Sequence, residues 1–368
     1  MTWRVGVLGA TGAVGQKMIQ HLAGHPWFRI TELAASERSA GKPYFDAVKW
    51  HQEAAIPAEV AGLEVKATLP DLECDFVLSA LDSHVAGPVE EAFAAAGYPV
   101  ISNSRNHRMD DDVPLVIPEV NPDHLDMIPW QKQRRGFTSG YLMTNPNCST
   151  VGLALALKPL HDAFGVEEVF VVTMQALSGA GYPGVPALDA HENVIPFISG
   201  EEEKMQTEPR KILGRLGDNG VDFADLRLSA QCNRVPVIDG HLESVTVRLK
   251  KKASPAEVSH VLASFSGEPQ RLGLPTAPEH PILVSHEHDR PQPRRDRDAG
   301  KGMSISVGRI RACSIADVKF TLLVHNTVRG AAGAAILNAE LLADRGMLPH
   351  RDRVEANSDE DVVAEEQV

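Results

Sequence analysis

The sequence has few cysteines, little positive charge and no long apolar run, and each shortage excludes a class of protein. Its four cysteines form no CxxC pair, so neither a disulfide framework nor a zinc site is indicated, and we expect no metal. No stretch approaches the roughly 18 to 20 consecutive apolar residues that a membrane-spanning helix needs. The N-terminus runs almost at once into a strand-like pattern, without the basic segment and cleavage site of a signal peptide. We therefore expect a cytoplasmic protein.

Acidic residues outnumber basic ones: 36 Lys and Arg against 49 Asp and Glu give a net charge of −13 at pH 7. This balance argues against a nucleic acid or an anionic membrane as partner. It is compatible with a small anionic substrate, because a local cluster of Arg and Lys can reverse the field inside one cleft. The length of 368 residues suits two domains, and 43% hydrophobic with 23% charged residues is ordinary for a globular enzyme.

Strands alternate with helices in the first part of the chain. This alternation predicts an α/β fold with a parallel, doubly wound sheet of the Rossmann type. The expected strands cover residues 4–9, 30–35, 74–80 and 99–102, and the expected helices cover 15–25 and 85–97.

After residue 148 the pattern changes, and strands recur with few intervening helices. Such a pattern predicts a mixed sheet in a second, α+β domain. We expect a helix over 149–160 and strands over 166–176, 234–237, 242–250, 303–310 and 317–324. The charged, Pro-rich segment 287–302 is interpreted as a mobile surface loop, and 330–342 as a small-residue helix that returns to the first domain.

A glycine-rich turn with the spacing GxxGxxG ends the first expected strand and opens the first helix. Glycines let the backbone approach a pyrophosphate, and a helix N-terminus offers free N–H groups and a partial positive charge. A tight turn without a ligand is the alternative, but the strand–turn–helix placement favours a dinucleotide cofactor. The cofactor-binding residues expected here are Gly9, Thr11, Gly12, Ala13, Val14 and Gly15.

The end of the second expected strand bears on the choice of cofactor. NAD-specific sites usually place an acid there to accept the ribose 2′-OH. This chain has Ser36, Arg38 and Ser39, which suit a 2′-phosphate and favour NADP, although Glu37 between them makes the pattern ambiguous.

Cys148 differs from the other three cysteines because a helix is expected to begin immediately after Asn147. The partial positive charge at a helix N-terminus lowers the pKa of a thiol. Cys148 is therefore predicted to be a thiolate nucleophile near neutral pH.

Seven motifs run along almost the whole chain, from about Trp3 to about Leu348. They are GATGAVG at 9–15, AASERSAGK at 34–42, VPLVIPEVNPDHL at 113–125, PNCST at 146–150, GEEEKM at 200–205, RVPVIDGH at 234–241 and HNTVRGAAGAAILNAELL at 325–342. Together they resemble the aspartate-semialdehyde dehydrogenase family, particularly its archaeal and fungal branch.

The resemblance implies a role for each residue that stands at one of the family's positions. Cys148 resembles the acyl-accepting nucleophile, His241 the general acid/base, and Gln175 the residue that orients the substrate. The implied substrate-binding residues are Arg234, Glu201, Lys204, Arg108 and Asn147, with Arg105 as a substitute for Arg108. Ser79 and Asn326 join the implied cofactor-binding residues. Each of these residues alone could have an ordinary structural role. Their spacing along the chain relative to Cys148 matches the family and favours a shared active site.

The implied activity is the NADPH-dependent reduction of L-aspartyl-4-phosphate to L-aspartate 4-semialdehyde through a cysteine thioester. It serves the biosynthesis of lysine, threonine and methionine, and the family forms homodimers or homotetramers. The chain then divides into a dinucleotide-binding domain (1–147 plus about 327–350), a catalytic and dimerisation domain (148–326) and a disordered acidic tail (351–368).

Three other functions share parts of this pattern. N-acetyl-glutamyl-phosphate reductase uses the same glycine turn and thioester, and malonyl-CoA reductase resembles this branch more closely but releases CoA instead of phosphate. The arginines at 105 and 108, with Glu201 and Lys204, favour an amino-acid phosphate. A non-catalytic NADP sensor would be expected to lack Cys148 or His241, and both are present.

Overall fold

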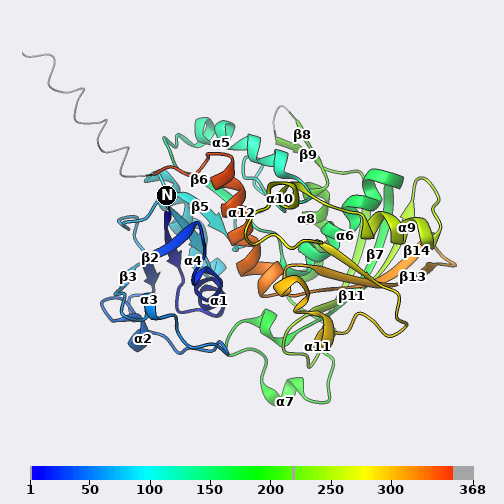
Figure 1. The fold of residues 1–368 in the computed structure, drawn as a ribbon, viewed down its shortest axis with the longest axis horizontal. Coiled ribbons are helices and arrows are strands. Elements are labelled where there is room, and N and C mark those ends of the chain that lie inside the picture. The colour runs from blue at the N-terminus through cyan, green and yellow to red at the C-terminus, as the bar shows by residue number, and fades with distance from the viewer. Residues whose placement is uncertain (1, 218–219, 351–368) are drawn as a thin grey trace, which may run out of the picture.

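The computed structural model describes residues 2–217 and 220–350, which fold around two six-stranded sheets. The first sheet uses the N-terminal part of the chain and the second its middle and later parts, and the last helix returns between them (Figure 1). The acidic tail predicted over 351–368 lies outside the described residues. Within the described residues, no helix combines the length and apolarity that crossing a bilayer requires.

The first sheet is wholly parallel, with the strand order β3-β2-β1-β4-β5-β6. Its strands are β1 (Trp3–Leu8), β2 (Phe28–Ala35), β3 (Val65–Ala67), β4 (Phe76–Ser79), β5 (Pro99–Ser102) and β6 (Tyr141–Thr144). Every residue of β4, β5 and β6 is buried, as expected where helices cover both faces of a parallel sheet. The predicted doubly wound fold is confirmed, and the strand order reverses between β1 and β4, where such folds bind ligands.

Helices flank this first sheet, and the C-terminal helix completes its core. The flanking elements are α1 (Ala13–Leu22), α2 (Tyr44–Ala47), α3 (Ala58–Ala61), α4 (Ser83–Ala95), η1 (Pro122–Met127) and α5 (Ile128–Arg135). The last helix, α12 (Gly333–Asp344), is buried at every position except its final residue. Its Ile336, Leu337 and Leu341 pack in one cluster with β1 and α1, so the predicted return of this helix to the first sheet is confirmed.

The second sheet is mixed and has the order β10-β7-β11-β14-β13-β12. Two neighbouring pairs are parallel, β10 with β7 and β12 with β13, and the others are antiparallel. Its strands are β7 (Val166–Gln175), β10 (Arg227–Arg234), β11 (His241–Leu249), β12 (Ile282–Ser285), β13 (Ile305–Ala312) and β14 (Val318–Val324). A separate short hairpin joins β8 (Arg215–Gly217) to β9 (Gly220–Asp222).

Helices cover one face of the second sheet. Its inward side chains, such as Val171, Val245 and Phe320, share a core with α6 (Cys148–Phe164), α8 (Glu201–Ile212) and α9 (Pro255–Ala263). The remaining short elements are η2 (Leu177–Ala180), α7 (Ala187–Ala190), α10 (Glu268–Leu272), α11 (Pro293–Asp296), η3 (Ala299–Gly302) and the π-helical turn η4 (Val328–Ala332).

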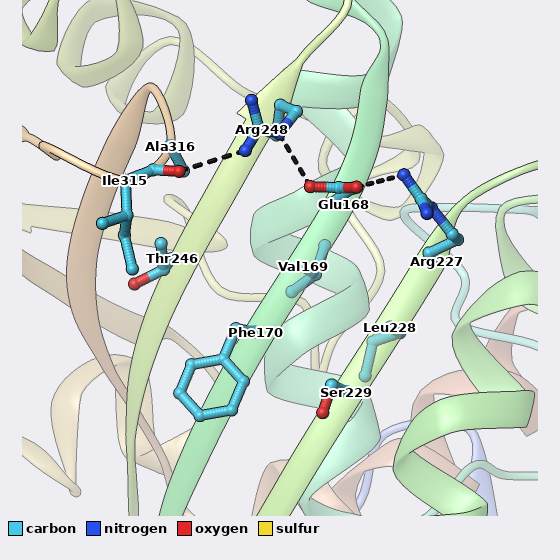
Figure 2. A pocket seen from close by; sticks show the side chains of 10 residues that line it. All are labelled: Glu168, Val169, Phe170, Arg227, Leu228, Ser229, Thr246, Arg248, Ile315 and Ala316. Carbon is cyan, nitrogen blue, oxygen red and sulfur yellow. Dashed lines mark hydrogen bonds and ion pairs between the residues drawn. The ribbon is translucent and has the colours of Figure 1, made fainter.

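The opposite face of the second sheet is open. Figure 2 shows Phe170, Leu228 and Thr246 on the three adjoining strands β7, β10 and β11, where they line a hollow of about 320 Å³. Phe170 is 47% exposed, and Glu168 at one end of the hollow forms ion pairs with Arg227 and Arg248.

One prediction about local structure is wrong, and another is incomplete. The strand expected over 234–237 lies earlier in the chain: β10 ends at Arg234, because the Pro- and Gly-containing residues that follow turn the chain back toward β11. The segment 287–302, interpreted as a mobile surface loop, contains the short elements α11 and η3. Asp296 organises it by pairing with Arg290 and accepting a hydrogen bond from the backbone of Gln292.

Candidate active site

Cys148 is the first residue of α6, as the sequence predicted. Strand β6 leads into this helix, and Asn147 caps it by accepting hydrogen bonds from the backbone N–H groups of Ser149 and Thr150 at 3.0 and 3.2 Å. The cap fixes the direction in which the thiol leaves the helix, so Cys148 points toward the edge of the second sheet.

Three predicted site residues meet at that edge. Gln175 ends β7, Arg234 ends β10 beside it in register, and His241 begins β11 on the other side of β7. The Nε2 atom of His241 lies 3.2 Å from the Sγ atom of Cys148. Nη1 of Arg234 donates to the carbonyl oxygen of Ala176 at 2.7 Å, so the guanidinium is held next to the same pair.

The tautomer of His241 follows from its second nitrogen. The backbone N–H of Ala176 donates to Nδ1 at 3.0 Å, so Nδ1 must keep its lone pair and the proton of the neutral ring resides on Nε2. That N–H faces the sulfur of Cys148. Burial also lowers the pKa of His241 to about 3, which keeps the ring singly protonated.

The inner face of α8 supplies acidic and basic groups from the opposite direction. Oε1 of Glu201 accepts hydrogen bonds from Asn147 at 2.7 Å and from Gln175 at 3.2 Å, and Lys204 pairs with the second carboxylate oxygen. Burial acts to raise the pKa of Glu201, but the charge of Lys204 and the hydrogen bonds outweigh it and leave the pKa below its ordinary value. Glu201 is therefore ionised at neutral pH. Through its two hydrogen bonds it links Asn147, which caps α6, to Gln175 at the end of β7.

The charge state of Cys148 differs from the sequence expectation. Although some of its surface is exposed, burial of the sulfur raises the pKa of the thiol to about 12, and the negative charge of Glu201 adds to this. Lys204, Arg108 and Arg234 act in the opposite direction. The free site therefore holds a thiol at neutral pH, because desolvation outweighs the helix N-terminus that the sequence argument relied on.

Arg108 is built into the protein framework. It donates from Nη1 to Glu208 at 2.9 Å and from Nη2 to the carbonyl oxygen of Asn103 at 2.7 Å. The other carboxylate oxygen of Glu208 accepts the backbone N–H of Asn147 at 2.7 Å. Of the three guanidinium nitrogens of Arg108, Nε is the one that is buried without a hydrogen-bond partner among the described residues. Arg105 is exposed instead, and its guanidinium lies beside Gly200 at the start of α8.

The glycine turn has the geometry that a dinucleotide requires. Gly9 has φ +76°, and a Cβ there would lie 2.7 Å from the carbonyl oxygen of Ala80. A Cβ on Gly15 would lie 2.3 Å from the carbonyl oxygen of Gly9. Gly12 caps α1 without a side chain to occupy the free N–H groups of its first turn. The close backbone approach and the free helix N-terminus fit a pyrophosphate at the switch point between β1 and β4.

The remaining predicted cofactor residues lie in different surroundings. Ser36 and Arg38 are exposed in a turn directly after β2, closed by a 2.8 Å hydrogen bond from the backbone of Ser39 to that of Ser36. The side chain of Ser79 is buried and donates to Glu90 at 2.6 Å, and the residue after it, Ala80, places its carbonyl oxygen beside Gly9 of the glycine turn. Asn326 is also buried; it donates to Ser178 and accepts from the backbone of Gly240, each at 2.8 Å.

Comparison with known proteins agrees with this geometry. A family model described as "Semialdehyde dehydrogenase, NAD binding domain" matches residues 4–128, and one described as "Semialdehyde dehydrogenase, dimerisation domain" matches residues 157–329. Aspartate-semialdehyde dehydrogenase of Archaeoglobus fulgidus is 54% identical over 93% of this chain and 98% of its own length. The chain belongs to the aspartate-semialdehyde dehydrogenase family. It is therefore a member of an oxidoreductase family with an NAD(P)-binding domain.

Fungal members of the aspartate-semialdehyde dehydrogenase family are similarly close. The aspartate-semialdehyde dehydrogenase of Schizosaccharomyces pombe is 51% identical over 94% of this chain and 99% of its own length. The crystal structure of the Candida albicans aspartate-semialdehyde dehydrogenase with NADP has a TM-score of 0.88 and 42% identity, and the match covers 95% of this chain and 100% of that one. The resemblance to the archaeal and fungal branch is thus confirmed.

Two site contacts were not predicted from the sequence. Glu208, which joins Arg108 to the residue before Cys148, follows Glu201 by seven residues on the same helix. The i, i+3, i+7 spacing of Glu201, Lys204 and Glu208 was a usable signal, because such residues share one helix face. The backbone N–H of Ala176, which sets the tautomer of His241, leaves no mark in the sequence.

Proposed function

We propose that this chain is an aspartate-semialdehyde dehydrogenase that reduces L-aspartyl-4-phosphate to L-aspartate 4-semialdehyde with NADPH and releases inorganic phosphate. The observation that carries the proposal is the 3.2 Å contact between Sγ of Cys148 and Nε2 of His241, with Arg234 and Gln175 on the adjoining strand ends. We place the reaction in the biosynthesis of lysine, threonine and methionine.

In the first step the sulfur of Cys148 attacks the acyl carbon of the substrate. A sulfur–carbon bond forms, the carbon–oxygen bond to phosphate breaks, and the products are a thioester and inorganic phosphate, which takes up the thiol proton. The Nε2–H of His241 stabilises the developing thiolate by donating a hydrogen bond to it. Lys204 and the arginines at 105 and 108 supply positive charge for the departing phosphate.

In the second step the thioester carbonyl is reduced and the carbon–sulfur bond breaks. NADPH, when bound at the glycine turn, supplies the hydride. We assign general acid/base catalysis to His241, with Nε2 as the atom that holds the proton. Collapse of the tetrahedral species releases the aldehyde and leaves Cys148 as a thiolate, which Nε2–H stabilises until the sulfur takes up a proton from solvent and the thiol of the free site is restored.

The substrate is oriented by its own charged groups. Arg234 is buried to 7% exposure and anchored through Nη1, so its remaining N–H groups suit a carboxylate, which a lysine would bind without the same two-point geometry. The ionised Glu201 suits the substrate ammonium group. Gln175, at the same end of the second sheet, donates a hydrogen bond to Glu201 that fixes its side chain.

NADP rather than NAD is the cofactor that the turn after β2 suits best. Ser36, Arg38 and Ser39 offer two hydroxyl groups and one exposed cation there, a combination that fits a 2′-phosphate. The C. albicans relative solved with NADP has the same fold.

A spectrophotometric assay of the reverse reaction tests the proposal. Aspartate semialdehyde, phosphate and NADP should generate NADPH, followed by its absorbance, and the Cys148→Ala variant should lose at least about 10⁴-fold in turnover while still binding NADP. Parallel reactions with CoA in place of phosphate, and with malonyl-CoA in the reductive direction, should show no turnover. Activity with CoA alone, or an active Cys148→Ala variant, would overturn the proposal.

We further propose the division of the chain into 1–147 plus about 327–350 as the dinucleotide-binding domain and 148–326 as the catalytic and dimerisation domain. The core cluster that unites β1, α1 and α12 supports the two-part first domain. We also propose a cytoplasmic location for the protein.

A homodimer, or a tetramer built from homodimers, is our proposal for the assembly. The open face of the second sheet is the surface we assign to it: Phe170, Leu228 and Ile315 are apolar, and Glu168 between Arg227 and Arg248 offers paired charges at one end (Figure 2). The match of residues 157–329 to a dimerisation domain supports this assignment.

A further inference from the structure

The π-helical turn η4 packs directly against the nucleophile. A Cβ on Gly330 would lie 2.7 Å from the Cβ of Cys148 and 2.9 Å from its Cα, so only glycine fits this contact. The turn is closed by a 3.0 Å hydrogen bond from the backbone of Gly330 to that of His325. Such π-helical turns are rare and are frequent at functional sites. The backbone at 330 therefore forms one wall of the space around Cys148.

The same segment also holds the chain next to His241. Asn326 accepts a 2.8 Å hydrogen bond from the backbone of Gly240, the residue directly before His241. Residues 325–330 thus contact Cys148 itself and the residue that directly precedes His241. A shift of this segment would move the sulfur and the imidazole relative to each other.

A buried ion pair anchors this segment. Arg329 and Glu119 form two parallel hydrogen bonds, one of 2.9 Å between Nη1 and Oε1, and their side chains are 1% and 0% exposed. Removing two charges from water is costly, and apolar residues of similar size would often give equal or greater stability. A role for the pair in precise positioning accounts for this arrangement better than stability does.

The segment of Glu119 is in turn fixed to the strand that leads to Cys148. It pairs with β6, where Leu115 bridges Thr144 and the backbone of Val116 donates to that of Thr144 at 3.0 Å. Strand β6 continues through Asn147 into Cys148. The ion pair therefore joins the strand that precedes the nucleophile to the turn that covers it.

We propose that Arg329 and Glu119 are positioning residues that set the distance between Sγ of Cys148 and Nε2 of His241. Neither touches substrate; they act through Gly330 and through Asn326. The inference rests on the proposed roles of Cys148 and His241, but it concerns the geometry of the pair and is testable apart from turnover.

The test is the full-length double variant Arg329→Met, Glu119→Leu, which removes both charges and keeps similar volume. The rate of iodoacetamide alkylation at Cys148 is measured against pH, with kcat, KM and NADP binding alongside. We expect alkylation at each pH from 7 to 9 to slow about threefold or more, because a longer Sγ–Nε2 contact stabilises the thiolate less. We expect kcat to fall about 10- to 100-fold, with KM and NADP affinity changed less than about threefold.

A matched control comes from Glu340, a buried carboxylate on α12. Its carboxylate forms hydrogen bonds with His25 at 2.8 Å and with the backbone N–H of Thr276 at 3.0 Å, both outside residues 325–330, so Glu340→Gln should lower the melting temperature but leave the alkylation profile unchanged. A folded double variant with the parent's alkylation profile and kcat would overturn the inference. If the double variant does not fold, Arg329→Lys decides on the same readouts, since it keeps the charge but loses the two-point contact. Failure of the proposed function would show separately, as turnover by Cys148→Ala.

Discussion

The backbone N–H of Ala176 donates a 3.0 Å hydrogen bond to Nδ1 of His241, on the side of the ring opposite to Cys148. A second proton on this imidazole would have to displace that hydrogen bond. The buried ring also has its pKa lowered to about 3. Both effects favour one neutral tautomer with its proton on Nε2, which distinguishes this pair from a preformed thiolate–imidazolium pair.

Nitrogen-15 NMR of histidine-labelled protein tests the tautomer. From pH 5 to pH 9, His241 should show a protonated Nε2 and an unprotonated Nδ1, without a titration step, because its lowered pKa lies below this range. Loss of the signals in His241→Gln assigns them to this residue. A titration of the assigned ring near pH 6.5 would contradict the prediction.

The two arginines that we assign to the departing phosphate should respond differently to substitution. Arg108→Ala leaves the carboxylate of Glu208 buried without its cation, so we expect a loss of about 3 kcal/mol in the free energy of unfolding, together with a lower kcat. Arg105→Ala removes an exposed side chain, so stability should change by less than about 0.5 kcal/mol while the KM for phosphate rises roughly tenfold.

Urea unfolding and phosphate-dependent kinetics of the two variants distinguish these effects. An Arg108→Ala protein of unchanged stability with only a raised KM for phosphate would show that Arg108, and not Arg105, binds the leaving group.

Glu243 should make stability depend on pH. It is fully buried two residues after His241, and neither carboxyl oxygen has a hydrogen-bond partner among the described residues. Burial raises the pKa of this carboxyl well above its ordinary value. The folded state therefore keeps a proton that the unfolded state releases, so this group costs about 1.4 kcal/mol of stability for each pH unit between its unfolded and folded pKa values.

Replacement by an uncharged amide removes that dependence. Glu243→Gln should gain stability over the parent as the pH rises from 5 to 8, measured by urea unfolding at each pH. The exposed Glu59→Gln serves as the control and should follow the parent at every pH. Parallel curves for Glu243→Gln and the parent would mean that Glu243 is ionised in the folded protein.

The open sheet face gives a prediction about assembly. Phe170→Asp places a charge in the lining of the hollow in Figure 2 and should weaken self-association by about 2 kcal/mol or more, seen by light scattering over a dilution series. Leu188→Asp, at a 94% exposed apolar residue outside this hollow, is the matched control and should not change the molecular mass. An unchanged mass for Phe170→Asp would exclude this face as the interface.

Local sequence patterns were sufficient for four of the six strands of the first sheet and for the start of α6, while β3 and β6 were not predicted. Glycine spacing, buried β-branched runs and the Asn-Cys sequence at a helix start all act over a few neighbouring residues, so they can be recognised along the chain. The end of β10 at Arg234 was misplaced because the residues after it remain apolar while a proline and a glycine turn the backbone.

Contacts between distant segments could not be predicted. The Arg329–Glu119 pair joins residues 210 positions apart, and neither residue has a periodic partner that would mark it as buried. The raised pKa of Cys148 likewise depends on how closely other segments surround the sulfur, whereas the helix start that suggested a lowered pKa is a local feature. Both the ion pair and the raised pKa depend on tertiary packing, which local sequence patterns do not reveal.

The return of α12 to the first sheet has a consequence for how the chain is made. Synthesis proceeds from the N-terminus, so β1 to β6 emerge long before residues 333–344, which cover part of their apolar surface. The core of the first sheet therefore stays incomplete until α12 has been synthesised, whereas the strands of the second sheet, which span 166–324, are all available before then. A chain that stops short of α12 would present that uncovered surface to chaperones and proteases instead of a finished enzyme.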